Sequence, residues 1–103
     1  MKRSEGLQLA SSFKQQLLKS GYPIKHVYLF GSVAKGTSDS HSDIDIAIVC
    51  YPFKISKHEE NVEFLWASKD IDLRIETVTL HPEDFQNKYF TLAKEIERYG
   101  VEA

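Results

Sequence analysis

The sequence predicts a small α/β (α+β) domain, in which helices pack on a three- or four-stranded mixed sheet. Segments with the three- to four-residue hydrophobic period of a helix alternate along the chain with β-branched and aromatic segments typical of strands. The chain has 103 residues, of which 42% are hydrophobic, and this is enough to build one compact core. Residues 1–103 are therefore expected to form a single domain.

The first part of the chain is predicted to contain a helix, a strand and a turn. Hydrophobic residues recur at helical spacing over residues 7–18, and Gly21 marks the stop. Residues 24–30 are rich in β-branched and aromatic side chains and predict a strand, which Gly31-Ser32 ends abruptly. Residues 33–42 leave room for one helical turn and then a polar loop.

The second part contains the clearest strand. Residues 43–50 alternate strictly, with isoleucines on one face and two aspartates on the other. A capping box at residues 56–59 opens a helix, a third strand is expected at 71–78, and a helical stretch at 82–100 ends at a glycine. The inner side of the middle helix is predicted to carry Val62, Leu65 and Trp66.

Composition argues against several classes of protein. The formal net charge of −2 provides no overall basic field, so DNA or RNA is not an expected partner. Cys50 is the single cysteine, which rules out an intramolecular disulfide, and no Cys/His spacing suits structural zinc. No apolar run approaches the ~18 residues of a membrane span, and the first residues lack the apolar core of a signal peptide. A cytoplasmic protein that does not act at a membrane is the simplest interpretation.

Three polar features are predicted to meet at one end of the sheet: the Gly31-Ser32 turn, the pair Asp43 and Asp45, and a third carboxylate on a neighbouring strand. Gly31-Ser32 follows a strand directly, and a glycine lets the backbone approach a ligand closely. Ser32 and the free N–H groups of the following turn could bind phosphate oxygens, with Lys35 adding a positive charge. Asp43 and Asp45 share one face of the next strand, where clustered carboxylates favour Mg²⁺.

A third carboxylate is expected on the neighbouring strand. Asp70, Asp72 and Glu76 share one face if that strand is regular. Asp72 is favoured because Ile71 and Leu73 flank it, with Asp70 as the reserve. Glu76 would lie about 13 Å further along at roughly 3.3 Å per residue, too far to share a metal with Asp72.

The run Gly31-Ser32, ten residues, then Asp43-Ile44-Asp45 is similar to the signature of the DNA polymerase β-like nucleotidyltransferase superfamily. The short chain resembles the minimal nucleotidyltransferase branch, many members of which act as antitoxins to HEPN-domain RNases. The resemblance extends from the first helix to about Gly100 and implies the polymerase β-like nucleotidyltransferase fold. It implies that Asp43 and Asp45 bind two Mg²⁺ ions, and that Asp72 binds the catalytic ion and helps to deprotonate the attacking hydroxyl.

The resemblance also implies a reaction. A nucleoside monophosphate, AMP from ATP in the antitoxin branch, would be transferred to a tyrosine hydroxyl of a HEPN toxin, with release of pyrophosphate. Relatives often carry an arginine where this chain has Val33, which leaves Lys35 as the nearest cation. Larger relatives have a helical domain that this chain lacks, so a second subunit or a partner protein would have to complete the site. Two alternatives stay open: modification of a small molecule such as an aminoglycoside, and a non-catalytic antitoxin that masks its partner.

Overall fold

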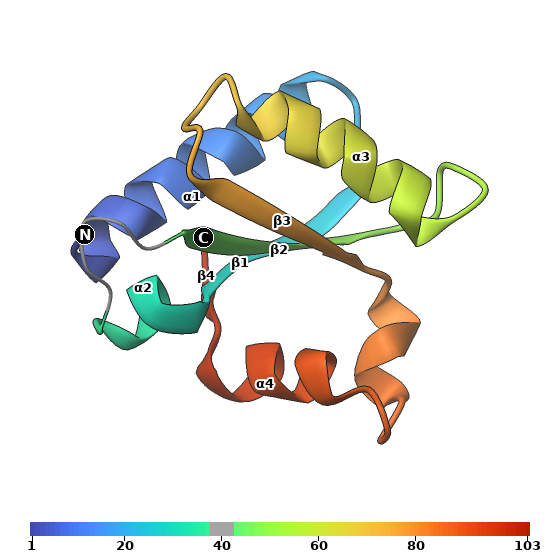
Figure 1. Ribbon diagram of the computed structural model, residues 1–103. Coiled ribbons are helices and arrows are strands. Elements are labelled where there is room, and N and C mark those ends of the chain that lie inside the picture. Colours follow the sequence, from blue (N-terminus) through green and yellow to red (C-terminus); the bar gives the residue numbers. More distant parts are fainter. Residues whose placement is uncertain (38–42) are drawn as a thin grey trace.

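The computed structural model describes residues 1–37 and 43–103 (Figure 1). Residues 38–42 of the predicted polar loop lie outside the described residues. None of the described helices is both long and apolar enough to cross a membrane. The predicted helical stretch at 82–100 is divided into two helices. In chain order the elements are α1 (Arg3–Lys19), β1 (Ile24–Phe30), α2 (Gly31–Lys35), β2 (Ile44–Cys50), α3 (Lys57–Ser68), β3 (Ile75–Leu80), the 3-10 helix η1 (Pro82–Gln86), α4 (Thr91–Tyr99) and β4 (Val101–Glu102).

The strands form one mixed sheet in the order β3-β2-β1-β4. β1 is antiparallel to both of its neighbours, β2 and β4, whereas β2 and β3 run parallel. A parallel pair needs a crossover connection, and α3 supplies it between β2 and β3. The mixed sheet with its flanking helices confirms the predicted fold class.

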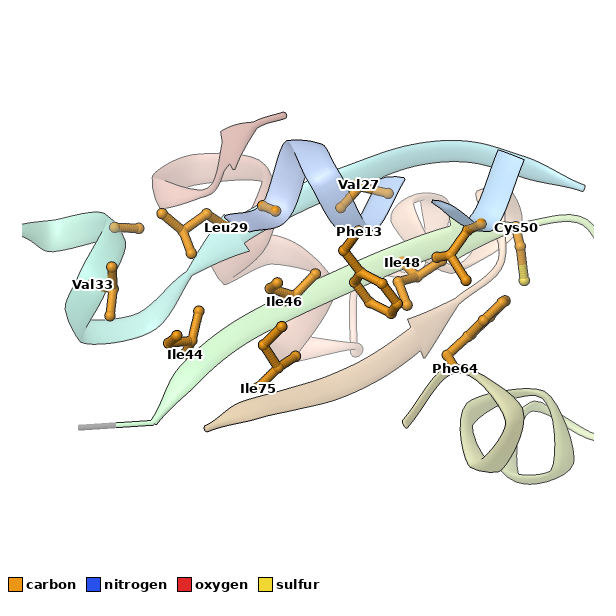
Figure 2. Close-up of a cluster of buried hydrophobic side chains, with 13 residues drawn as sticks. Phe13, Val27, Leu29, Val33, Ile44, Ile46, Ile48, Cys50, Phe64 and Ile75 are labelled. Atoms are coloured by element: carbon orange, nitrogen blue, oxygen red, sulfur yellow. The ribbon is translucent and has the colours of Figure 1, made fainter. Parts of the chain in front are cut away.

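Helices cover both faces of this sheet. α1 and α3 lie on one face, while η1 and α4 lie on the other (Figure 1). The larger hydrophobic core lies under α1 and α3 and includes Phe13, Ile46 and Phe64 (Figure 2). The smaller core lies under α4 and includes Val49 and Ile96. Because side chains alternate along a strand, residues 45, 47 and 49 of β2 face α4, and residues 44, 46, 48 and 50 face α1 and α3.

The third strand begins four residues later than the sequence predicted. α3 ends at Ser68, whose backbone C=O accepts the N–H groups of Ile71 (2.9 Å) and Asp72 (3.0 Å). The Asp72 carboxylate then accepts the backbone N–H of Arg74 at 2.8 Å, which forms a local side-chain-to-backbone turn. These bonds hold the chain in turns up to Arg74, so Asp72 lies before β3 and not within it.

The N-terminus of the middle helix α3 is capped as predicted, but the helix is rotated about its axis relative to the prediction, so that other residues face the core. Ser56 Oγ accepts the N–H of Glu59 at 3.2 Å. The inner side carries neither Val62 nor Trp66, however, and Trp66 is 76% exposed. Phe64 fixes the rotation, because its ring packs edge-on against Tyr22 with centroids 5.2 Å apart. The buried residues of α3 follow at four-residue spacing: Glu60, Phe64 and Ser68.

This rotation predicts contrasting effects for two aromatic residues two positions apart. Phe64→Ala removes a fully buried ring and should lower the free energy of unfolding by about 3–5 kcal/mol. Trp66→Ala should change it by no more than about 0.5 kcal/mol, since that ring lies largely in solvent. Urea denaturation of both variants measures the difference, and equal losses would contradict the observed helix rotation.

Candidate active site

Gly31 brings the end of β1 directly against Asp45 of β2. Its φ angle is +73°, a conformation that residues with a side chain rarely adopt. A Cβ at this position would also overlap Oδ2 of Asp45. The antiparallel register pairs Phe30 with Asp45, so the glycine turn and the carboxylate meet at this end of the sheet. The sequence predicted this juxtaposition.

Ser32 is held at the same place by the short helix α2. It is the second residue of that helix and is partly buried. Gly36, in a left-handed conformation with φ +75°, ends the helix after one turn. The Ser32 C=O accepts the backbone N–H of Thr37 at 3.0 Å. The turn that carries Ser32 is therefore closed from both sides, by Gly31 before it and by Gly36 after it.

Asp43 and Asp45 begin the second strand. Asp45 is partly buried on the face covered by α4, and Asp43 is exposed just before the strand. Burial raises the pKa of the Asp45 carboxyl, and the negative charges of Asp43, Glu76 and Glu95 raise it further. Asp45 thus lies among three other carboxylates, which come from β3, from α4 and from the residue just before β2.

Glu76 is the residue that the parallel strand brings to Asp45. β2 and β3 pair Ile44 with Ile75 and Asp45 with Glu76. Paired residues of neighbouring strands lie about 4.8 Å apart across the sheet, and their side chains point to the same face. Ile75 is buried in the core under α1 and α3, which leaves Glu76 on the opposite face with Asp45. The structure therefore places Glu76 where the third carboxylate was expected.

Asp72 does not join this group. Its carboxylate is bound by its neighbour Arg74, with Nε at 3.0 Å from Oδ1 and Nη2 at 2.8 Å from Oδ2. Those bonds lower the pKa of Asp72 below its ordinary value. Asp72 and Arg74 line a hollow with Glu5 and Gln8 of α1, on the face opposite to Asp45. The predicted strand position of Asp72 is wrong because β3 starts too late to include it.

The sequence contained the signal for Glu76. Glu76 was set aside because of its distance from Asp72, whereas the distance to Asp45 is the one that matters. A parallel register in which Ile44 and Ile75 share the core puts the residues that follow them side by side. No sequence pattern pointed to Glu95, which reaches the site through the packing of α4 against the sheet.

Lys35 lies at the edge of this acidic group but is already engaged. Its Nζ is 3.7 Å from Oε1 of Glu95 and 5.3 Å from the ring centroid of Tyr99. Both contacts join α2 to α4. A phosphate that used Lys35 would therefore have to compete with Glu95.

The arrangement suits divalent cations better than any other ligand that the donor atoms could take. Carboxylate oxygens are hard ligands, which Mg²⁺ prefers. Burial and the neighbouring negative charges raise the pKa of Asp45, and a bound cation would offset this cost of ionising it. Asp43, Asp45 and Glu76 are the residues that would hold the metal, with the Gly31–Ser32 turn beside them.

Clustered carboxylates facing a glycine-serine turn on a mixed sheet define a domain of the nucleotidyltransferase class. The chain belongs to the polymerase β nucleotidyltransferase family, whose model matches residues 14–99. Over 69 residues it is 35% identical to a proposed protein adenylyltransferase of Methanocaldococcus jannaschii, a match that covers 63% of this chain and 66% of that protein. The family predicted from the sequence is confirmed.

Solved structures support the same fold. A proposed nucleotidyltransferase from Sulfolobus solfataricus superposes with a TM-score of 0.66 at 24% identity, covering 97% of this chain and 80% of the other. A chain of the toxin–antitoxin complex MntA-HpeT carrying Y104A superposes with a TM-score of 0.64 at 21% identity, and the match covers 90% of this chain and 69% of the other. A chain of a toxin–antitoxin complex with AMP-PNP superposes with a TM-score of 0.59 at 22% identity, and the match covers 88% of this chain and 69% of the other.

The acidic group makes the stability of the metal-free protein depend on pH. Because the folded-state pKa of Asp45 is raised, its contribution is most favourable below the unfolded-state pKa of about 3.9 and is lost as pH rises through the folded-state value. Asp45→Asn should therefore raise the melting temperature in magnesium-free buffer near neutral pH, and the gain should shrink on acidification. Melting curves of both proteins across this pH range measure it. A gain independent of pH would contradict the assigned electrostatics.

The two candidate third carboxylates can be separated directly. Glu76→Gln should raise the concentration of Mg²⁺ and ATP that gives half-maximal stabilisation. The increase should exceed the roughly tenfold affinity loss typical of an outer-shell partner. Asp72→Asn should keep it, since Asp72 lies on the other face. The half-saturating concentration in thermal-shift titrations, each referred to the variant's own baseline, provides the measurement. A loss with Asp72→Asn but not with Glu76→Gln would restore the original assignment.

Proposed function

We propose that this domain transfers a nucleoside monophosphate, AMP from ATP, to a hydroxyl group, with two Mg²⁺ ions held by Asp43, Asp45 and Glu76. The observation that carries the proposal is the pairing of Asp45 with Glu76 beside the Gly31 turn. The bound ions would neutralise phosphate charge and polarise the α-phosphate. This proposal keeps the two aspartates of the sequence prediction and replaces Asp72 by Glu76.

The residues of the chain have separable parts in this reaction. Backbone N–H groups at Gly31 and Ser32 and the Ser32 hydroxyl would orient the triphosphate, which approaches closely because Gly31 has no side chain. Glu76 accepts the proton of the attacking hydroxyl. The new bond joins the acceptor oxygen to the α-phosphorus, the bond from that phosphorus to the bridging oxygen breaks, and pyrophosphate leaves. Lys35 would add a positive charge near the phosphates after releasing Glu95.

A tyrosine of a HEPN-domain toxin is the proposed acceptor. Two findings support it: the relative from M. jannaschii is described as a protein adenylyltransferase, and chains of toxin–antitoxin complexes share the fold. The open acidic site fits a large acceptor, since both Asp43 and Glu76 are exposed. A partner protein would then supply the remaining wall of the site.

The experiment incubates the purified chain with ATP labelled at the α-phosphate, Mg²⁺ and a candidate HEPN toxin. We expect label on a toxin tyrosine. The rate of labelling should be at least about 100-fold lower with Asp45→Asn or Glu76→Gln, since each removes an electrostatic group at the reacting phosphate. Asp72→Asn is the matched control and should label normally. Peptide mapping by mass spectrometry locates the modified residue.

Each other outcome identifies a different function. Neutralisation of the toxin by Asp43→Asn and Asp45→Asn variants, without any label, would mean that the chain masks its partner. Label transferred to an aminoglycoside and not to protein would identify a small-molecule nucleotidyltransferase. An absence of label on every hydroxyl acceptor, together with no stabilisation by Mg²⁺ and ATP, would overturn the proposed chemistry.

A further inference from the structure

A second group of metal-ligating side chains lies at the other end of β2. Cys50, Glu60 and His81 come from three separate elements: the last residue of β2, the first turns of α3 and the residue before η1. One ligand atom from each lies within 4.8 Å of the other two. Cys50 is five residues from Asp45, about 17 Å along a strand, and faces the opposite side of the sheet. This group is therefore separate from the acidic site.

Burial sets these three side chains apart from ordinary surface residues. Cys50 is fully buried and belongs, with Phe64, to the larger core, where it lies at one end of the labelled side chains (Figure 2). The Glu60 side chain is 0% exposed and that of His81 12%. Burying a carboxylate is costly unless its charge is compensated, so the position of Glu60 needs an explanation.

Hydrogen bonds hold Glu60 in a fixed orientation. Its Oε2 accepts the backbone N–H groups of Phe53 (2.8 Å) and Lys54 (3.3 Å). Its Oε1 faces Nε2 of His81 at 2.6 Å. Burial alone would raise the pKa of Glu60, but these donors together lower it, so the group stays ionised. One oxygen is thus fixed by the backbone, while the other points at the histidine and is free to exchange that partner for a cation.

We propose that Cys50 Sγ, Glu60 Oε1 and His81 Nε2 form a binding site for a borderline-soft divalent cation such as Zn²⁺. Sulfur, imidazole nitrogen and one carboxylate oxygen are the ligand types that Zn²⁺ takes, whereas Mg²⁺ avoids sulfur. A thiolate and a carboxylate carry two negative charges, which a divalent cation balances in the buried site. The backbone bonds to Oε2 provide the outer-shell support typical of metal-binding carboxylates.

The surroundings leave a route and a fourth coordination position. A hollow of about 220 Å³ opens beside His81, lined by Tyr51, Pro52, Pro82 and Glu83. Of the three proposed ligands His81 lines this hollow, so a cation would enter past its ring, and water would complete a tetrahedral set. No sequence pattern indicates this group, because Cys50, Glu60 and His81 are too far apart in the chain to form a recognisable zinc motif.

Binding must compete with the hydrogen bonds of the cation-free state. Burial and the charge of Glu60 raise the pKa of the Cys50 thiol to about 12, so the cation must displace the thiol proton. Nε2 of His81 must also exchange its contact with Oε1 of Glu60 for the cation. Affinity should consequently be weaker than at a preformed structural zinc site.

The single cysteine makes a direct test possible. The reduced full-length chain is titrated with Co²⁺, and a thiolate-to-cobalt charge-transfer band in the near ultraviolet reports Cys50 alone, since the chain has no other thiol. We expect the band to reach a plateau with one Co²⁺ bound per chain, and we expect Zn²⁺ to displace the cobalt. His81→Gln and Glu60→Gln should each raise the half-saturating Co²⁺ concentration at least about tenfold.

Two controls separate this site from others. Asp43→Asn with Asp45→Asn removes carboxylates of the acidic group, and His58→Ala removes an exposed histidine of α3; both should leave the band unchanged. No band at a large excess of Co²⁺ in the wild-type chain would overturn the proposal, whether or not the variants fold. A band that His81→Gln and Glu60→Gln leave unchanged would do the same, because it would show cobalt on the cysteine alone.

Discussion

Parallel pairing of β2 with β3 is the constraint on which the acidic site depends. Ile44 and Ile75 are both buried in the larger core, and this fixes the register of the two strands. A shift by one residue would turn the isoleucines toward the wrong face, so the register is strongly determined. Once the isoleucines are in place, Asp45 and Glu76 have no alternative but to lie side by side. Hydrophobic burial therefore sustains a repulsive pair of charges.

The backbone at Gly31 packs directly against one of these two charged side chains, Asp45. Gly31 allows the end of β1 to lie against Asp45, where any side chain would overlap the carboxylate. The same contact partly buries Asp45 and so raises its pKa. The Gly31 turn and the crowded carboxylates thus meet at one end of the sheet.

Sequence patterns predicted the elements well where the pattern was strong. The alternation of residues 43–50 and the Ser56 cap correspond to β2 and α3, and the Gly31-Ser32 turn lies beside Asp45 as expected. The start of the third strand was wrong because hydrogen bonds from Ser68 and Asp72, which no periodicity reveals, extend the turn after α3. The choice between Asp72 and Glu76 depended on that boundary. The predicted inner face of α3 was wrong for a related reason, since the packing of Phe64 against Tyr22 decides the rotation of the helix.

The covering helix α4 also influences the electrostatics of the site. Glu95 contributes to the raised pKa of Asp45 and holds Lys35 in an ion pair, so a charge on this helix acts on the sheet beneath it. Altering the surface charge of α4, for instance to improve solubility, would change the potential at the carboxylates without touching them. Residue 95 is therefore a position at which an engineer could tune cation affinity from outside the sheet.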